Sequence, residues 1–234
     1  MKLKDKVALI TGGGRGIGKA VALDYAREGA RIAICSRTGA EIETAAKEIK
    51  ALGTECLAVE CDVSLEEPVK KLVEKVQERF GRIDVLINNA GVMIRPAPVA
   101  ETELKKWDYT MAVNLRGPFL VTKAVLPLMM RRKSGAIINV SSSIGRGAYA
   151  NFAAYATSKW GIEGFTQTLA AEVRSYNIRV NSVEPGYVAT KLTGYRGSTP
   201  ESVTGVFVFL GTDESGGITA RMLSSSGWKT EVRK

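Results

Sequence analysis

Two residues capable of acid–base chemistry stand four positions apart in "YATSKWG", residues 155–161. On a helix, residues i and i+4 share a face, so the Tyr155 hydroxyl and the Lys159 ammonium would lie close together. Because a nearby cation favours the phenolate, Lys159 is predicted to lower the pKa of Tyr155 and make it a usable proton donor. The same spacing is also typical of an ordinary amphipathic helix, in which the tyrosine is half buried and the lysine reaches water.

The elements that must position this pair follow from apolar runs of strand length between longer amphipathic stretches. Strands that alternate with helices predict right-handed crossovers and a parallel sheet, and their continuous apolar character predicts that both faces are covered. The expected strands are "KVALIT", "RIAIC", "CLAVE", "IDVLI", "AIINVS" and "IRVNSV". We therefore predict an α/β fold: a Rossmann-type doubly wound parallel sheet in three layers, one domain over residues 1–234, with ligands at the carboxyl ends of the strands.

Residue types also set the expected helix boundaries. Ser64 followed by Glu67 is typical of a capping box, and Thr199 before a proline is typical of a helix start. Pro127 is expected to kink a long helix running from about Leu104 to Arg131, or to mark its last turns. Glycines that are expected to end helices are Gly29, Gly53 and Gly81.

The first expected strand runs directly into "GGGRGIGKA" and then an amphipathic stretch. Glycines there let the backbone turn and approach a pyrophosphate, whose charge a helix N-terminus stabilises. Gly12, Gly16 and Gly18 form G-x-x-x-G-x-G, which differs from the G-x-G-x-x-G dinucleotide fingerprint. Residues 13–19 also satisfy G-x-x-x-x-G-K, but the triphosphatase loop next requires Ser or Thr for magnesium, and this chain has Ala20.

Further motifs follow this loop in a fixed order. The glycine loop resembles the cofactor loop of the classical short-chain dehydrogenase/reductase family, in particular its members that reduce 3-oxoacyl carrier-protein thioesters. "CDV" resembles the adenine contact of that family, "NNAG" its central-strand motif and "MAVNLRG" its helix asparagine. "NVSSSIG" and "YATSKWG" resemble its catalytic segments, and "PGYVAT" its nicotinamide-side loop. The likeness extends from Lys6 to about Leu223.

The resemblance implies four catalytic residues: Asn114, Ser142, Tyr155 and Lys159. In this family Tyr155 would transfer the proton, Lys159 would also hold the nicotinamide ribose, Ser142 would bind the substrate oxygen and Asn114 would hold a relaying water. The implied cofactor-binding residues are Gly12, Arg15, Gly16, Ile17, Gly18, Ser36, Arg37, Asp62, Val63, Asn89, Ala90, Gly91, Tyr155, Lys159, Pro185, Gly186, Val188 and Thr190.

Each of these residues has a structural alternative. The choice of Ser142 rests on the serine-to-tyrosine spacing of the family, and the three serines at 141–143 could instead form a polar turn. Asn114 could cap local backbone, and Thr190 could begin a loop.

The choice of nicotinamide cofactor depends on the end of the second strand. NAD sites place an acid there for the ribose 2′-hydroxyl, whereas this chain has Ser36 followed by Arg37. Arg37 and Arg15 could clasp a 2′-phosphate, so NADP(H) is expected in preference to NAD(H). The alternative is that both arginines are ordinary exposed cations.

Composition excludes several classes of protein. The 45% hydrophobic and 24% charged residues are typical of a soluble globular protein, and no apolar run could cross a bilayer or serve as a signal peptide, so a cytoplasmic location is predicted. Cys35, Cys56 and Cys61 lack metal-ligand spacing, and the chain has no histidine, so no metal site is expected. The net charge of +9 is scattered, which argues against a nucleic-acid surface.

Two departures from the family pattern stand out. Only "KLTGYRGS", residues 191–198, lies where the family carries a longer segment over the substrate, so we predict a shortened lid. "ITARMLSSSGW" lacks the aspartate-glycine-glycine that closes the last strand of the family and helps build its tetramer. A homodimer or homotetramer is still the expectation.

The sequence thus predicts an NADP(H)-dependent oxidoreductase that interconverts a carbonyl and an alcohol, with 3-oxoacyl thioesters as first substrate candidates. Arg131, Arg132 and Lys133 motivate this substrate, because related reductases dock an acidic carrier protein there; these cations could instead compensate a helix C-terminus. The alternative function is an NADP(H)-binding regulator with little turnover, if the short lid cannot position a substrate.

Overall fold

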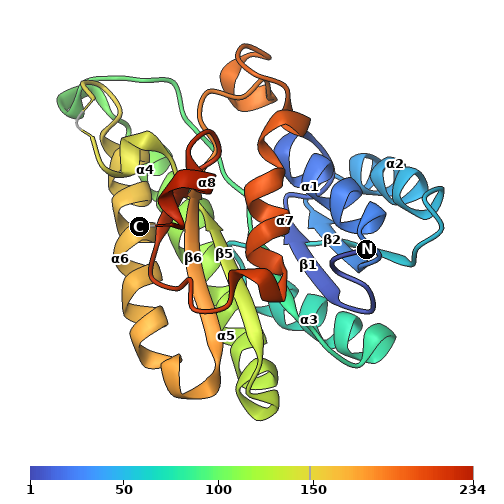
Figure 1. The fold of residues 1–234 in the computed structure, drawn as a ribbon. Coiled ribbons are helices and arrows are strands. Elements are labelled where there is room, and N and C mark those ends of the chain that lie inside the picture. Colours follow the sequence, from blue (N-terminus) through green and yellow to red (C-terminus); the bar gives the residue numbers. More distant parts are fainter. Residues whose placement is uncertain (148, 234) are drawn as a thin grey trace.

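The computed structural model describes residues 1–147 and 149–233. The centre of the fold is one seven-stranded parallel sheet (Figure 1). The strand order is β3-β2-β1-β4-β5-β6-β7, so the winding direction reverses between β1 and β4. The strands are β1 (Val7–Thr11), β2 (Arg31–Ser36), β3 (Cys56–Glu60), β4 (Val85–Asn88), β5 (Gly135–Val140), β6 (Ile178–Glu184) and β7 (Met222–Ser224). All six expected strands are confirmed within two residues, and β7 is a further short strand that the apolar pattern did not predict.

Helices cover both faces of the sheet and give three layers. One face carries α1 (Gly16–Arg27), α2 (Gly39–Lys50) and α7 (Gly205–Gly211), and the other carries α3 (Glu66–Phe80), α5 (Gly117–Arg132) and α6 (Ala153–Glu172). Alternate strand residues divide between the two cores: Ala8 and Ile10 belong to the first, Val7 and Leu9 to the second. This division follows from the two-residue period of a strand. The predicted doubly wound fold is confirmed.

Two helices and seven short turns complete the described chain. They are α4 (Leu104–Met111), α8 (Trp228–Glu231), η1 (Val99–Glu101), η2 (Ala112–Arg116), η3 (Ser143–Gly145), η4 (Arg174–Tyr176), η5 (Lys191–Thr193), η6 (Pro200–Val203) and η7 (Asp213–Ser215).

The helix boundaries correct one expectation. Gly81 ends α3 with φ 72°, and Gly29 and Gly53 follow the ends of α1 and α2, as predicted. Ser64 does not cap α3, which begins at Glu66. Instead the backbone N–H and the hydroxyl of Ser64 both donate to Asp62 Oδ1, at 2.9 and 2.6 Å. The Asp62 carboxylate thus holds Ser64 in a local turn and prevents the capping box.

The long helix expected over residues 104–131 is interrupted well before Pro127. α4 and α5 are joined by η2, a π-helical turn at Ala112–Arg116 that contains Asn114. Pro127 lies in the last two turns of α5, which continues to Arg132. Because π turns insert an extra residue into a helix, the irregularity falls at a predicted site residue and not at the proline.

The amino-terminal edge of the sheet is held by an ionic cluster around the buried Asp84. Its carboxylate accepts from the Val7 N–H at 2.9 Å and from Arg82 Nε at 2.8 Å, and it pairs with Arg132. Burial raises the pKa of Asp84, but hydrogen bonds from Arg82, Val7 and Arg132 outweigh burial, so the pKa lies below its ordinary value. Arg132 therefore serves the fold, and only Arg131 and Lys133 of the basic cluster remain exposed.

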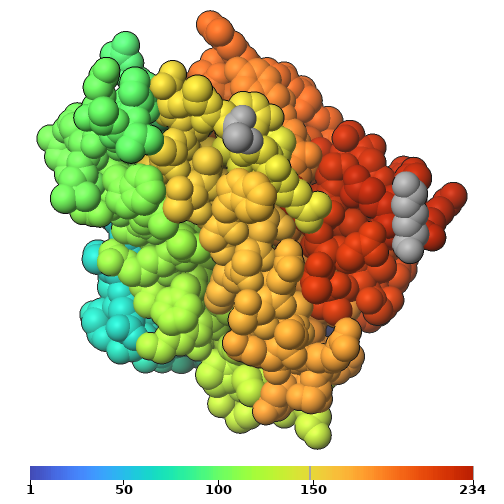
Figure 2. All heavy atoms as spheres, turned by 90° about the vertical axis from the view of Figure 1, so that its left-hand side faces the viewer, coloured from blue at the N-terminus to red at the C-terminus, as the bar shows by residue number. Residues whose placement is uncertain are grey.

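The carboxyl-terminal segment folds back onto the first core although its sequence departs from the family pattern. Trp228 of α8 stacks on Phe209 of α7 with ring centroids 4.7 Å apart. Glu231 accepts from the Ser224 N–H at 2.8 Å and so ties α8 to β7. Figure 2 shows this segment, in red, at the surface beside α6.

Candidate active site

A cavity of about 480 Å³ lies at the carboxyl edge of the sheet, where the winding direction reverses. Every predicted catalytic or cofactor residue lines it except Gly18 and Asn114. Several further residues line the cavity that were not predicted from the sequence: Gly14, Thr38, Glu41, Cys61, Val92, Met93, Val113, Val140, Ser141, Lys191, Leu192 and Thr193. The topology thus brings segments between Gly12 and Thr193 to one cavity.

The glycine loop forms one wall and fits a pyrophosphate. Gly12 has φ +65°, and a Cβ there would meet the Asn89 side chain at 2.8 Å. Gly18 lies behind the loop, where a Cβ would come within 2.4 Å of the Gly12 carbonyl, so its smallness serves close packing. No side chain caps the start of α1 at Arg15, which leaves the first N–H groups of the helix without a side-chain partner beside the cavity. Such an N-terminus stabilises a bound phosphate.

Thr11, at the end of β1, holds the glycine loop to the loop after β4. Its hydroxyl accepts from the backbone N–H groups of Asn89 and Ala90, each at 3.0 Å. Asn89 Nδ2 in turn donates to the carbonyls of Thr11 and Gly12, at 2.8 and 3.2 Å. This role of Thr11 was not predicted from the sequence, although its position directly before the glycine loop could have indicated it.

Two arginines and a serine line the end of the cavity beside β2. Arg15 Nη1 lies 2.6 Å from Glu41 Oε1. Arg37 Nη1 donates to the Tyr109 hydroxyl at 2.6 Å, and its guanidinium carbon lies 5.5 Å from the centroid of that ring. Ser36 occupies the end of β2, where an NAD site places an acid. Both predicted phosphate-binding cations are therefore present at the cavity, and both already have partners from other elements.

Tyr155 and Lys159 lie on α6 at the opposite end of the cavity, and both are at least nine-tenths buried. Lys159 Nζ donates to the Val140 carbonyl at 2.8 Å and lies 5.6 Å from the Tyr155 ring centroid. Burial lowers the pKa of Lys159 to about 8, although the Glu163 carboxylate opposes this shift.

The prediction that Lys159 lowers the pKa of Tyr155 is wrong for this arrangement. Burial raises the pKa of Tyr155, and the Ser142 hydroxyl, not Lys159, is the group that opposes burial. The physical reason is that desolvation disfavours the phenolate while the ammonium is directed to the Val140 carbonyl. Tyr155 is thus held protonated, as a proton donor requires.

The three serines after β5 occupy different environments. Ser142 lines the cavity and caps η3, where its hydroxyl accepts from the Ile144 N–H at 3.3 Å. Ser141 also lines the cavity, and its buried hydroxyl has no hydrogen-bond partner among the described residues. Ser143 is exposed. The structure therefore brings Ser141 and Ser142, but not Ser143, to the predicted site.

Asn114 lies behind the cavity wall, almost wholly buried. Its Oδ1 accepts from the Val92 N–H, and its Nδ2 donates to the Val92 carbonyl, both at 2.8 Å. Nδ2 also donates to the Ser158 hydroxyl at 3.1 Å. The side chain thus joins the loop after β4 to α6, which agrees with the structural alternative of backbone capping.

The short segment after β6 is a folded loop. Thr190 and Thr193 cap each other across η5, and Thr193 Oγ1 accepts from the Thr190 N–H at 3.0 Å. The Ala189 N–H donates to the Ser198 carbonyl at 2.8 Å, which closes the base of the loop. Tyr187 and Tyr195 project into solvent, with 62% and 72% of their surface exposed. Neither of these two rings lines the cavity.

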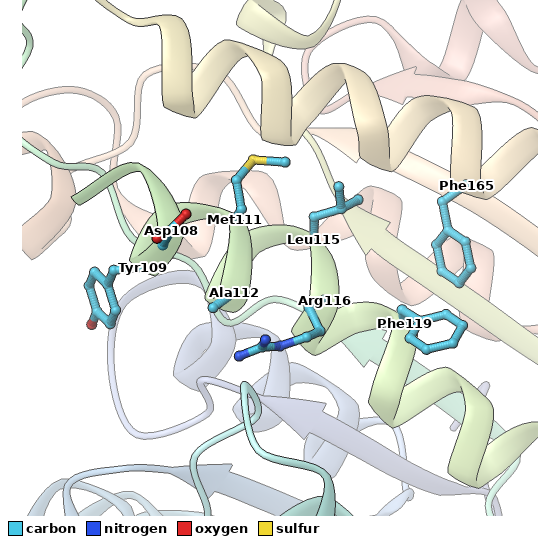
Figure 3. A pocket seen from close by; sticks show the side chains of 8 residues that line it. All are labelled: Asp108, Tyr109, Met111, Ala112, Leu115, Arg116, Phe119 and Phe165. Atoms are coloured by element: carbon cyan, nitrogen blue, oxygen red, sulfur yellow. The ribbon is translucent and has the colours of Figure 1, made fainter. Parts of the chain in front are cut away.

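A second hollow, of about 810 Å³, lies on the surface formed by α4, η2, α5 and α6 (Figure 3). Phe119 and Phe165 lie side by side in it, with ring centroids 6.4 Å apart, and Asp108 and Arg116 supply its charges.

The described residues contain no group of three or more His, Cys, Asp or Glu side chains arranged to hold a metal ion. Among the described helices, none combines the length and apolar character that a bilayer crossing requires. All three cysteines are buried and free.

Comparisons with known proteins agree with this geometry. The model of the short chain dehydrogenase family matches residues 6–201. A 3-oxoacyl-(acyl-carrier-protein) reductase from Thermotoga maritima is 37% identical over 97% of this chain and 98% of its own. The crystal structure of an NAD+-bound xylitol dehydrogenase superposes with a TM-score of 0.91 at 33% identity, over 96% of this chain and 98% of that one.

A solved chain from Beutenbergia cavernae with NADP bound at low occupancy has a TM-score of 0.90 at 32% identity and covers 98% of both chains. Proteins similar to this chain thus differ in the nicotinamide cofactor they hold and in the substrates for which they are named. Their shared fold and the family match lead to one conclusion. The chain belongs to the short-chain dehydrogenase/reductase family of oxidoreductases.

Proposed function

We propose that this chain, acting as a single domain over residues 1–234, is an NADP(H)-dependent oxidoreductase that interconverts a carbonyl and an alcohol. The observation that carries this proposal is the cavity itself: it joins an uncapped helix N-terminus at the glycine loop to a buried Tyr155 and Lys159. A phosphate-bearing cofactor and a proton donor are the two requirements of carbonyl reduction.

The residues divide the work between the two ends of the cavity. When bound, the nicotinamide supplies or accepts the hydride. Tyr155 donates the proton to the substrate oxygen, Ser142 donates a hydrogen bond to the same oxygen, and Lys159 binds the ribose. Asp62, Val63 and the residues Asn89 to Gly91 line the adenosine and central parts of the cavity. Asn114 holds the wall between the central loop and α6.

The preference for NADP(H) is proposed from charge. Arg15 and Arg37 line the cavity beside β2, and Ser36 replaces the acid that would repel a 2′-phosphate. A bound 2′-phosphate would compete with Glu41 for Arg15 and with the Tyr109 hydroxyl for Arg37. These partners are exposed or partly exposed, so the exchange costs little free energy.

The substrate class is proposed from similarity, with 3-oxoacyl thioesters as first candidates. The named reductase from Thermotoga maritima supports this choice. The basic cluster of Arg131, Arg132 and Lys133 does not support this choice. Arg132 pairs with Asp84, and the other two residues lie before β5, at the amino edge of the sheet. Since a six-residue strand spans roughly 20 Å, a carrier protein docked there would sit far from the cavity of the same chain.

The test is consumption of NADPH with a panel of carbonyl compounds that includes a 3-oxoacyl thioester of coenzyme A. Turnover with any member supports an enzyme, and wild-type preference for NADPH over NADH supports the charge argument. Binding of NADPH without turnover across the panel would contradict the enzyme and favour a cofactor-binding regulator.

We also propose a homo-oligomer that buries the hollow on α4, α5 and α6. Phe119 is about half exposed there, and Asp108 and Arg116 give the surface both signs of charge. A twofold interface can pair such charges between copies. Light scattering of the purified protein tests this state, and a monomer at micromolar concentration would contradict it.

A cytoplasmic location stays a prediction from the sequence.

A further inference from the structure

Glu163 is a buried carboxylate for which the proposed mechanism has no role. It lies on α6 one turn after Lys159 and is 6% exposed. Ser182 of β6 donates to Oε2 at 2.9 Å, whereas Oε1 is buried and has no hydrogen-bond partner among the described residues. Burying an ionised carboxylate is unfavourable unless an opposite charge compensates it. Its position therefore requires an electrostatic explanation.

Two cations are available to compensate Glu163. Arg146 Nη2 lies 3.8 Å from Oε2, but more than half of that side chain is in solvent, where screening weakens the pair. Lys159 is buried and lies at i−4 on the same helix, so it faces the same side as Glu163. Lys159 has one hydrogen bond, to the Val140 carbonyl, and that acceptor carries no full charge. Attraction between the two buried charges is stronger than it would be in water.

The other elements packed on α6 bring few charges to this pair. Among the described residues, no charged side chain of α4 or η4 forms a hydrogen bond or ion pair with Lys159 or Glu163. β6 contributes the Ser182 hydroxyl, and η2 reaches α6 through the neutral Asn114 and Ser158 contact. The segment after β5 contributes Arg146, and α6 itself contributes Tyr155. Glu163, one helical turn after Lys159, is the anion whose charge raises the pKa of Lys159.

We propose that Glu163 is a positioning residue that keeps the Lys159 side chain charged at the nicotinamide end of the cavity. The proposal rests on the proposed function, because a charged Lys159 matters only if it binds the ribose of the cofactor. Glu163 itself lies outside the cavity lining and acts through Lys159.

The direction of the effect follows from the charges. Burial lowers the pKa of Lys159 to about 8, and the Glu163 carboxylate raises it. Glu163→Gln keeps an acceptor for Ser182 but removes the charge, so the pKa of Lys159 falls further. A lysine is charged below its pKa, so the variant loses the charge of Lys159 at lower pH than wild type. The alkaline fall in carbonyl reduction should move to lower pH with it.

The experiment titrates the protein labelled with 13C at the lysine ε-carbon and follows the Lys159 resonance, assigned with Lys159→Arg. In E163Q the midpoint should fall by about one pH unit, the effect of removing one close charge. Ser182→Ala is the matched control: it removes the hydrogen bond to the same carboxylate but keeps the charge, so the midpoint should stay near the wild-type value. Arg146→Gln, on the exposed side, should move it slightly upward.

The rate of carbonyl reduction against pH is measured on the same proteins. Coincident Lys159 midpoints in wild type and E163Q would overturn the proposal, as would equal effects of E163Q and S182A on the pH profile. If E163Q does not fold, absence of an upward shift in R146Q overturns it. If wild type shows no turnover with any carbonyl, the proposed function fails, while the titration still decides whether Glu163 sets the charge of Lys159.

Discussion

The two ends of the cavity hold their cations in opposite ways. At the end beside β2, Arg15 and Arg37 are exposed and paired with Glu41 and Tyr109, which come from α2 and α4. At the end beside α6, Lys159 is 5% exposed and directed to a backbone carbonyl. Exposed pairs contribute little free energy and exchange partners readily. The free energy of a buried cation depends instead on the charges and hydrogen bonds of every neighbour.

This difference teaches how the site can vary. Substitutions beside β2 should change which cofactor binds and leave the chemistry intact. Substitutions beside α6 should change the chemistry and leave cofactor choice intact. The family comparison agrees with this division, since similar folds are found with NAD+ and with NADP.

The largest expected effect is at the buried end. Tyr155→Phe removes only the hydroxyl that donates the proton, so turnover should fall by about 10²- to 10⁴-fold while the Kd for NADPH is unchanged. Steady-state kinetics and a fluorescence titration measure the two quantities. Tyr195→Phe, the same change on an exposed ring, is the control and should behave as wild type. Near-normal turnover of Y155F would remove Tyr155 from the mechanism.

A smaller effect is expected at the exposed end. Ser36→Asp combined with Arg37→Gln should shift preference from NADPH toward NADH by one to two decades in kcat/KM, because an acid repels the 2′-phosphate and a charge-assisted contact of roughly 1.5 to 3 kcal/mol is lost. Tyr109→Phe is the control, since it removes the acceptor of Arg37 and keeps the cation. A wild-type preference for NADH would contradict the charge argument before any variant is made.

A change of a few fold in NADPH affinity is expected from the partner of Arg15 at the exposed end. Glu41→Gln frees Arg15 from its partner and removes a negative charge from the cavity lining, so NADPH should bind up to about fivefold more tightly, the worth of an exposed ion pair. NADH affinity should not change. Glu48→Gln is the control: Glu48 lies on α2 like Glu41, but it pairs with Lys19 of α1 away from the cavity lining. This variant should leave both affinities at wild-type values. Equal gains in the two glutamine variants would indicate a general charge effect.

The smallest variation is expected across substrates. Because Tyr187 and Tyr195 point into solvent and the loop over residues 191–198 is short, bulky ketones should react almost as well as small ones, with high KM values. A size series of ketones under saturating NADPH measures kcat/KM. A sharp optimum for one small substrate with a micromolar KM would show that another element, such as a second copy of the chain, covers the site.

The sequence by itself determined the sheet, the glycine loop and the location of Tyr155 and Lys159. These signals are local: a strand is read from its apolar run, Gly12 from the turn that it permits, and the Tyr155 and Lys159 pair from the period of one helix. Residues that share such an element are fixed relative to one another as soon as the element forms. The resemblance to the family added the order of the motifs, and the topology then placed nearly all of them around one cavity.

Only the tertiary structure decided the partners of those charged side chains that pair between different elements. Arg37 meets Tyr109 across 72 positions, Arg132 meets Asp84 across 48 and Glu163 meets Ser182 across 19. The same holds for the pKa of Tyr155, which burial raises although a lysine stands one turn away. Crossovers set these neighbours, and desolvation in the assembled core raises the pKa of Tyr155. Neither effect can be obtained from residues that are close in sequence.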